Sequence, residues 1–598
     1  RQRQMCIRDR YSNDWMMKHS LSVTGQEGRT GYNLSISYTD NPGLIKDTGY
    51  QRYFLRANVY SDITKWLRIG TRVWGYHTDQ KKSDTGSLTN INTQKMIPGV
   101  YPYYDGKYGA PEANEEDPQS HNPLWDMAQS EGHIKNTQFF TTFYANVKFL
   151  KHFSYDVNLN YKDYRYESMS VNTDYGKYSF STDQWIAAPK DPADLYTRMA
   201  YVRENHWKLT HLLNYNQTFH KHDIGMLLGF EEERFAKRTT DTAKLGLIDS
   251  SVGDPSSATT PSSISGTGEE FTSRSYFGRI NYAFDSRYLF EVNMRYDGSS
   301  RFAPDNRWGL FPSFSAGWRI DQEAFMANTQ NWLSNLKLRV SWGQLGNQSI
   351  GLFQYTPIMS SGVNYIFGNT TATGYAITQA VDPEISWETT TITNLALDFG
   401  IFNNSLSGSI EFFKKRTKDI LRSVNQPSQV GNLTGAMRNI GTVDNTGLEA
   451  NLAYRNNIGA FNYHVFGNVT YVKNEVVHIG GDDMINGKRI TREGYPIDAY
   501  YLYICDGIFQ SEDQVKHHAY QSANTHAGDL IFRDVSGPEG VPDGQITEDD
   551  RVVTGSSVPD FTYSFGLNLD YKGIGLNVFF QGVSGISTYP THNLVYPY

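Results

Sequence analysis

Apolar and polar residues alternate with a period of two along the stretch 273–345. Tyr276 and Phe284 fall on one face of an extended segment, and Arg279 and Asn281 fall on the other. Successive side chains of a β-strand point to opposite faces of the sheet, which produces this period. The same pattern recurs in the segments 288–297, 309–320 and 335–345. The stretch therefore predicts four hairpin strands, each with one apolar face and one polar face.

The length of these segments favours a membrane-spanning sheet. Alternation continues for about ten to twelve residues, which exceeds the roughly five or six of an ordinary strand and matches the roughly 9–11 tilted residues that cross a bilayer. Aromatic residues such as Tyr276, Phe284, Tyr288 and Tyr296 stand at the segment ends, where interfacial girdles form. We expect the apolar face to contact lipid and the polar face to line a wet lumen. A soluble all-β protein remains the alternative, because its strands also alternate.

Alternating runs along the whole chain predict about eighteen strands. They cover residues 15–25, 31–39, 51–61, 66–77, 136–149, 152–165, 205–218, 223–236, 273–284, 288–297, 309–320, 335–345, 388–399, 404–416, 446–455, 460–472, 560–570 and 574–584.

Short and long connections alternate between these strands. Turns such as 285–287 and 571–573 are short, whereas connections such as 78–135, 236–272 and 473–559 are long. Outer-membrane barrels have this asymmetry, with short periplasmic turns and long extracellular loops. No blade repeat of a propeller is apparent. We predict an all-β, antiparallel, up-and-down transmembrane barrel.

Composition agrees with that fold class. Hydrophobic residues make up 38% of the chain, and we find no apolar run of the length of a membrane helix. The chain has 41 Tyr, 32 Phe, 11 Trp and 52 Gly, a mixture that favours β structure with aromatic belts and many turns. Its 55 basic and 63 acidic residues argue against a nucleic-acid partner. Cys6 and Cys505 are too few for a disulfide framework.

Residues 1–10, RQRQMCIRDR, lack the alternation that follows them and are interpreted as a non-native scar. We expect residues 11–598 to form one barrel region with long extracellular loops, incomplete at both ends.

Several longer segments resemble the SusC/RagA family of TonB-dependent outer-membrane transporters. They include SYFGRINYAFDSRYLFEVNMRYDGSSRF, GLFPSFSAGWRI, LKLRVSWGQLGNQSIG, ISWETTTITNLALDFGIFNNSLSGSIEFFKKRTKDIL, NIGTVDNTGLEANLAYRN and PDFTYSFGLNLDYKGIGLNVFFQG. Together they extend over nearly the whole chain from about Tyr11.

This resemblance implies an outer-membrane barrel of about 22 strands that is closed by a plug. It also implies TonB as the source of energy and a SusD-like surface lipoprotein as the partner that captures substrate. No plug domain or TonB box is recognisable in this sequence. We therefore expect the chain to be the barrel part of a larger transporter from a Bacteroidetes-like bacterium.

An acidic loop, DVSGPEGVPDGQITEDD, is the best candidate for a metal site. Without its insertion PEGVP it is similar to a calcium-binding loop, in which oxygen ligands recur at fixed positions. The expected ligands are Asp534, Ser536, Asp543, the Gln545 carbonyl and Asp550. The insertion breaks the spacing, so a solvated acidic turn remains the alternative, and calcium is expected only as a structural ion.

Aromatic residues in the predicted loops are candidates for substrate binding, because flat rings stack on sugars or contact peptide side chains. They are Tyr101, Tyr103, Tyr104, Trp125, Trp185, Tyr500, Tyr501 and Tyr503. Packing within the loops is the alternative for each of them. The polar faces of the strands supply charged residues that we expect to contact a plug and water. They are Arg279, Glu291, Arg295, Asp297, Arg319, Lys337 and Arg339.

We find no metalloprotease, nucleophile-elbow or phosphate-binding motif, so the sequence does not indicate an enzyme. The favoured function is import of oligosaccharides or other oligomeric nutrients across the outer membrane. Import of peptides by a protein of the same family is the first alternative. A secreted all-β carbohydrate-active enzyme or binding protein, and a passive porin or adhesin, are further alternatives.

Overall fold

The computed structural model describes residues 14–43, 48–81, 101–110, 122–173, 175–247, 252–424, 429, 433–537 and 540–589. It contains one 18-stranded sheet and several sheets of two to four strands. The chain divides into two compact units. The first unit comprises residues 1–215, 227–276 and 590–598, and the second comprises residues 216–226 and 277–589.

The first unit is a run of antiparallel strands that pair in chain order, as the predicted meander requires. These strands are β1 (Met17–Glu27), β2 (Thr30–Asn41), β3 (Tyr50–Asp62), β4 (Leu67–Lys81), β7 (Ser130–Phe149), β8 (Phe153–Asn172) and β11 (Tyr196–Phe219). Strands β12 (His222–Leu247) and β13 (Ala258–Phe284) also have most of their residues in this unit.

The second unit continues the pattern with nine antiparallel strands that pair in chain order. They are β14 (Tyr288–Ser299), β15 (Trp308–Arg319), β16 (Leu333–Asn347), β21 (Glu388–Ile401), β22 (Leu406–Val424), β23 (Ala436–Ile458), β24 (Phe461–His478), β31 (Phe561–Tyr571) and β32 (Ile574–Ser584). All eighteen predicted strands are thus confirmed, each at its predicted place in the chain.

Smaller elements lie in the connections between these strands. In the first unit they are β5 (Tyr103–Tyr104), β6 (Lys107–Tyr108), α3 (Pro123–Ala128), β9 (Lys177–Ser179), β10 (Gln184–Ala187), η2 (Pro192–Asp194) and η3 (Pro255–Ser257). In the second unit they are η4 (Pro304–Asn306), η5 (Ile320–Gln322), η6 (Ala324–Thr329), β17 (Met359–Ser361), β18 (Tyr365–Phe367), β19 (Thr370–Ala372), β20 (Tyr375–Ile377), β25 (Met484–Asn486), β26 (Arg489–Thr491), β27 (Ala499–Leu502), β28 (Cys505–Ile508), α4 (Glu512–His517), β29 (Leu530–Phe532), η8 (Glu548–Asp550) and β30 (Val552–Gly555).

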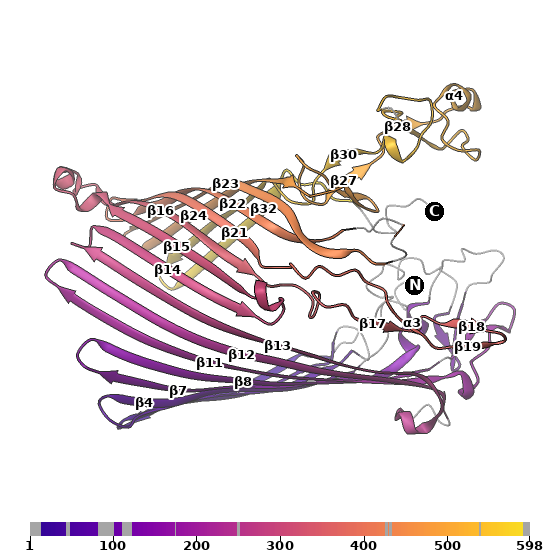
Figure 1. Cartoon of the computed structure of the whole chain (residues 1–598), viewed down its shortest axis with the longest axis horizontal. Coiled ribbons are helices and arrows are strands. Elements are labelled where there is room, and N and C mark those ends of the chain that lie inside the picture. Colours follow the sequence, from indigo (N-terminus) through magenta and orange to yellow (C-terminus); the bar gives the residue numbers. More distant parts are fainter. Residues whose placement is uncertain are drawn as a thin grey trace. The chain divides into compact units, whose positions relative to one another are not determined.

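Short turns join the strands at one end of each unit. The β1–β2 turn passes through Gly28 at φ +55°, and the β31–β32 turn through Lys572 and Gly573 at φ +46° and +88°. Positive φ at such positions matches a tight turn to the twist of the strands. In the second unit, the turns lie at the left end of the strands in Figure 1, and β27, β28, β30 and α4 extend beyond the other end. The alternation of short and long connections is confirmed.

The lengths of several loops were predicted wrongly. Residues 236–272, expected to be one long loop, are mostly strand, because β12 continues to Leu247 and β13 begins at Ala258. Strands β22 and β23 also continue into the predicted connection 416–445. Strands β12 and β13 stay neighbours in the sheet although these extensions are mostly polar, so apolar alternation ends before the strand does. The extensions of β22 and β23 carry apolar residues such as Ile420 and Val443, which pack against each other.

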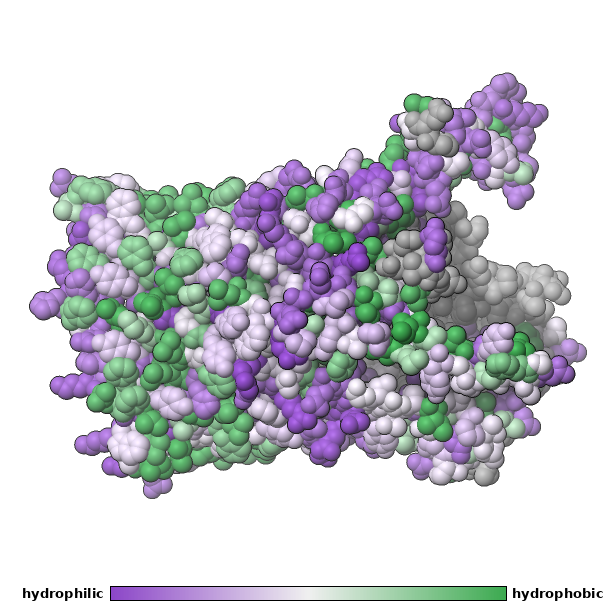
Figure 2. Space-filling view, viewed as in Figure 1, coloured by the Kyte–Doolittle hydropathy of each residue, from purple (hydrophilic) through white to green (hydrophobic). Residues whose placement is uncertain are grey.

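The two faces of the sheet differ as the alternation predicts. Paired residues in the second unit form one apolar row, in which each side chain is 40–51% exposed. The row consists of Leu395, Phe412, Leu448, Tyr471 and Phe561. Figure 2 shows apolar residues gathered over the turn-side part of the strands β14–β16, with a hydrophilic band nearer the loops.

On the opposite face, charged side chains of neighbouring strands pair with one another. The Arg339 guanidinium donates two hydrogen bonds to Asp398, at 2.7 and 2.9 Å, and one to Glu411 at 3.4 Å. This face would be costly to expose to lipid, whereas the apolar row would be costly to expose to water.

A small buried core lies on the loop side of the second unit. It consists of Phe302, Phe311, Ile350, Ile385 and Trp387. The Trp387 indole N–H donates to the Arg307 carbonyl at 3.0 Å, so the one polar atom of that ring is satisfied.

Among the described residues, no helix has both the length and the apolar character that a membrane-spanning helix needs.

We predict that Phe314→Arg destabilises the protein in a membrane by about 2–4 kcal/mol, because Phe314 lies near the middle of β15 on the apolar face. Ser315→Arg is the matched control, since Ser315 lies beside it on the polar face. Reversible unfolding by denaturant in lipid vesicles measures both variants. Equal destabilisation by the two substitutions would contradict the assignment of the faces.

Candidate functional site

The first predicted group of aromatic residues lies on a small hairpin in the first unit. Tyr103 pairs with Tyr108 across β5 and β6, and the turn between them has Asp105 and Gly106 at positive φ. The Asn122 side-chain amide holds both sides of this segment, donating to the Pro102 carbonyl at 2.7 Å and the Gly109 carbonyl at 2.8 Å.

A second hairpin, β9–β10, lies against the first one. Gly109 forms a parallel bridge with Tyr178, and the Ala110 N–H donates to the Tyr178 carbonyl at 3.0 Å. These contacts bring together segments about 70 residues apart in the sequence. The backbone therefore gathers two aromatic-rich segments that the sequence keeps separate.

The rings of the two hairpins form two sets of contacts, with centroids 4.9–5.9 Å apart. One set joins Tyr101, Tyr104, Tyr178, Phe180 and Trp185, and the other joins Tyr103, Tyr108 and Tyr175. We call the two sets together the aromatic cluster. It consists of Tyr101, Tyr103, Tyr104, Tyr108, Tyr175, Tyr178, Phe180 and Trp185. Ring pairs at these distances attract one another beyond the burial of their area, which fixes their orientation.

The aromatic cluster still exposes much of its ring surface. Tyr101, Tyr103, Tyr104 and Trp185 are 40–62% exposed, and Tyr178 beneath them is buried. The Lys107 ammonium lies 3.7 Å from the centroid of the Tyr178 ring. The cluster thus offers flat apolar surfaces, hydroxyl groups and a cation side by side.

Four of the eight predicted aromatic residues belong to this cluster, and sequence reasoning missed four other members. Tyr108, Tyr175, Tyr178 and Phe180 were not selected, although aromatic residues are dense in both segments. Their density was the available signal, but the sequence alone does not show which two loops meet.

Trp125 lies on α3, partly buried, with the Lys177 ammonium 4.0 Å from its ring centroid. Lys177 belongs to β9, so Trp125 contacts the second hairpin through this lysine. No contact between Trp125 and the rings of the aromatic cluster is observed among the described residues.

Two other predicted substrate-binding residues, Tyr500 and Tyr501, do not have the exposed rings that the prediction expects. Both side chains are buried in the second unit, and Tyr501 packs in a core with Ile490 and Ala499. The Arg551 guanidinium covers the Tyr501 ring at 4.9 Å. Burial leaves these rings no face for a substrate. Tyr503 is partly buried and its ring lies 5.2 Å from that of Phe532.

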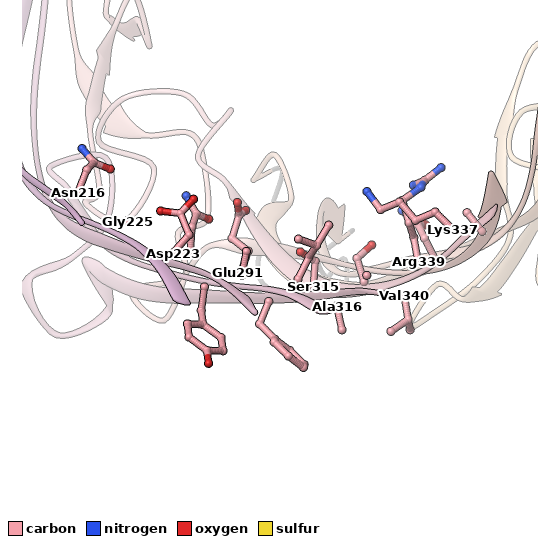
Figure 3. A pocket seen from close by; sticks show the side chains of 18 residues that line it. Asn216, Asp223, Gly225, Glu291, Ser315, Ala316, Lys337, Arg339 and Val340 are labelled. Carbon is pink, nitrogen blue, oxygen red and sulfur yellow. The ribbon is translucent and has the colours of Figure 1, made fainter. Parts of the chain in front are cut away.

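Three of the predicted charged residues of the polar face, Glu291, Lys337 and Arg339, line a hollow of about 540 Å³ in the second unit. Asn216, Asp223, Glu291, Lys337 and Arg339 project from one side of the sheet in Figure 3, and Val340 projects from the other. The hollow is open and polar, in agreement with a face that meets water or another polar surface. Its geometry identifies no particular substrate.

The acidic loop folds around the carboxyl group of Asp550, which is fully buried. One oxygen accepts the N–H groups of Val535 and Ser536 at 2.9 and 3.1 Å, and the other accepts that of Thr547 at 2.7 Å. Thr547 and Asp550 also form a capping box at the start of η8. Burial alone raises the pKa of Asp550, but these backbone hydrogen bonds outweigh it and lower the pKa below its usual value.

The predicted calcium ligands are only partly brought together. Asp534 accepts the Gly544 N–H at 2.7 Å through one oxygen, and its other oxygen is buried without a hydrogen-bond partner. Asp543 accepts the Gln545 N–H at 2.9 Å, which closes a local turn. No group of three or more His, Cys, Asp or Glu side chains within the described ranges could hold a metal ion. Calcium in this loop stays a prediction.

Comparison with known proteins decides the family. Residues 73–595 match the family described as TonB dependent receptor-like, beta-barrel. The chain belongs to this family. Its membership confirms the predicted barrel fold and location in the outer membrane, and the family consists of transporters and not of enzymes.

Individual relatives agree with the predicted SusC/RagA type. TonB-dependent receptor P26 of Formosa agariphila is 26% identical over 97% of this chain and 59% of its own length. TonB-dependent receptor SusC of Bacteroides thetaiotaomicron is 28% identical over 81% of this chain and 51% of its own length. The chain thus spans between half and three fifths of these relatives.

The solved structure of the RagAB peptide importer in the open-open state has the same fold. The TM-score is 0.80 at 23% identity, over 95% of this chain and 61% of that one.

We predict that Asp550→Asn destabilises the acidic loop by about 1–3 kcal/mol. Asn has an NH₂ group in place of one carboxylate oxygen, and an NH₂ group cannot accept the Thr547 N–H that this oxygen accepts. Asp549→Asn, an exposed neighbour, is the control and is expected to be neutral. Hydrogen exchange at the amides of Val535, Ser536 and Thr547 measures the effect.

The same carboxyl group gives the loop a pH dependence. The pKa of Asp550 is lower in the folded loop than in the unfolded chain, so its stabilisation is present above the unfolded value of about 3.9 and is lost as the pH falls through the folded pKa. Amide protection that did not change in acid would contradict this role of Asp550.

Proposed function

We propose that the intact protein imports oligosaccharides across the outer membrane in a TonB-dependent manner. Family membership supports transport of a nutrient. The aromatic cluster supports a sugar polymer as the substrate, because exposed rings next to hydroxyl groups suit the apolar faces and the hydroxyl edges of sugars. Four exposed rings on two adjoining hairpins can contact several sugar units at once, so an oligomer is favoured over a monosaccharide.

We further propose that a SusD-like surface lipoprotein captures the substrate and delivers it to this protein. The relation to SusC supports such a partner. The TonB complex would supply the energy for passage of the substrate. The chain itself catalyses no covalent step in this proposal.

Import of peptides is the second candidate. The fold is similar to that of the RagAB peptide importer. Aromatic rings and the nearby Lys107 would then contact peptide side chains and carboxylates. The two candidates differ in the ligand that competes for the aromatic cluster.

The transport proposal predicts outer-membrane location together with a bound lipoprotein. The full-length gene is expressed with its neighbouring lipoprotein gene in a Gram-negative host, and membranes are fractionated. A heat-modifiable protein that co-purifies with the lipoprotein in mild detergent is the expected result. A soluble protein without a partner would contradict the proposal.

The substrate proposal predicts weaker glycan binding when exposed rings are removed. Tyr101→Ala, Tyr104→Ala and Trp185→Ala together are expected to lower affinity for oligosaccharides about tenfold or more. Trp332→Ala, an exposed ring beside the turn-side end of β16, is the control. Calorimetry with oligosaccharides and with oligopeptides gives the readout. Binding of peptides but not of glycans would favour the second candidate instead.

We also propose a weak structural calcium ion in the acidic loop. The unpartnered oxygen of Asp534 supports it, and so does Gly544, whose φ of +83° makes the turn that such loops require. Because both oxygens of Asp550 already accept N–H groups, we expect an affinity of about 10⁻⁴–10⁻³ M.

Terbium luminescence, displaced by calcium, measures this site in the purified protein. Asp534→Asn is expected to abolish the signal, and Asp549→Asn is expected to preserve it. A signal that survives Asp534→Asn would place the ion elsewhere.

A further inference from the structure

A row of cations lies directly beside the apolar row on the lipid-facing side of the second unit. Lys414 follows Phe412 on β22, and Lys473 follows Tyr471 on β24, each two residues nearer the loops. Thr446 of β23 lies between the two lysines and pairs with both. A step of two residues along a strand covers roughly 7 Å and returns to the same face. The surface therefore changes from apolar to cationic within one such step.

The next position on the same face adds Arg416, which pairs with Asp444 on β23. We call Lys414, Arg416 and Lys473 the cationic row. All three side chains are partly open to the surroundings, at 50%, 38% and 64% exposed. The row thus faces outward like its apolar neighbours and can reach the headgroups of surrounding lipids.

Neighbouring carboxylates balance these charges only in part. Asp444 is shared, since Arg416 donates two hydrogen bonds to it at 2.6 Å and the Lys414 ammonium lies 3.5 Å away. Lys473 contacts Glu475 at 2.6 Å. Three cations therefore face two carboxylates, and each lysine ammonium has further N–H groups to donate.

The side of the membrane follows from the loops. The cationic row lies toward the 425–435 and 479–560 connections, on the same side as the long loops, which face the outside of the cell in outer-membrane barrels. The outer leaflet of a Gram-negative outer membrane carries phosphorylated glycolipids, whose phosphates lie just above the hydrocarbon. Basic residues near a membrane surface attract such anionic headgroups.

We propose that the cationic row binds the phosphate of an outer-leaflet glycolipid of the lipid A type, with its acyl chains on the apolar row. Arg416 presents a planar fork and the two lysines present rotatable ammonium groups, which together suit the several oxygens of a phosphate. Phe412 and Leu448 lie one step toward the membrane, where the first methylene groups of the acyl chains would pack. The proposal depends on location in the outer membrane and is independent of the transported substrate.

A smaller arrangement of the same kind occurs in the first unit. Arg165 and Arg203 share Asp163, at 2.8 and 3.5 Å, and both guanidinium side chains are strongly exposed. Arg165 of β8 and Arg203 of β11 pair with each other. Arg165 is two residues beyond Asp163, which pairs with the exposed Phe139. An experiment must therefore count bound lipids and not only detect them.

Native mass spectrometry of the full-length protein in mild detergent, with added lipid A, counts the bound molecules. Lys414→Gln, Arg416→Gln and Lys473→Gln together are expected to remove one bound lipid and to weaken its binding about tenfold or more. Phosphatidylethanolamine, which is zwitterionic, is expected to bind equally to the wild type and to the triple variant. Heat-modifiable migration checks that the variant is folded.

The matched control combines Lys415→Gln and Lys337→Gln, two lysines of the opposite face. It is expected to bind lipid A like the wild type. The proposal is overturned if the triple variant keeps all its bound lipid or if the control loses as much. Displacement of lipid A by millimolar inorganic phosphate would also overturn it, because the ligand would then be a soluble anion.

Discussion

Every backbone N–H and C=O group that faces hydrocarbon has to find its partner within the protein, because lipid offers none. In this chain neighbouring strands meet that requirement through long uninterrupted registers, such as the one that pairs β7 with β8 from Ser130 to Phe149. The side-chain pattern follows from this pairing. A continuous antiparallel register places alternate residues on opposite faces, so one face can be apolar and the other polar along the whole strand.

Outside the hydrocarbon this constraint is relaxed, and the strands are used differently. Strands β12 and β13 continue well past the apolar positions with polar residues on both faces. The segment between β24 and β31 folds around a small core of its own, formed by Ile490, Ala499 and Tyr501. Charged side chains lie where the lipid-facing part of the strands ends. Lys414 and Lys473 occupy this position beside Phe412 and Tyr471.

The candidate binding surface, the aromatic cluster, lies in the connections outside the hydrocarbon. Its hairpins are short and are held by few backbone contacts, among them the bridge between Gly109 and Tyr178 and the hydrogen bonds of Asn122. Loops fixed by a rigid sheet can vary in sequence without loss of the fold, which is how one architecture serves many substrates. The outward face of the strands cannot vary in that way, because lipid accepts only apolar side chains and interfacial charges.

The sequence by itself determined the strands, their faces and the alternation of short and long connections. Apolar alternation is a local signal, and the membrane enforces it on every strand, so residues such as Phe290 and Leu310 reveal their exposure without knowledge of any partner. The sequence did not determine how the loops fold. Tyr101 and Tyr501 both lie in polar, tyrosine-rich loops, yet one ring is open and the other is covered by Arg551, about fifty residues further along the chain. Only the tertiary structure decides which distant segment covers a loop side chain, because no periodic environment imposes that choice on the sequence.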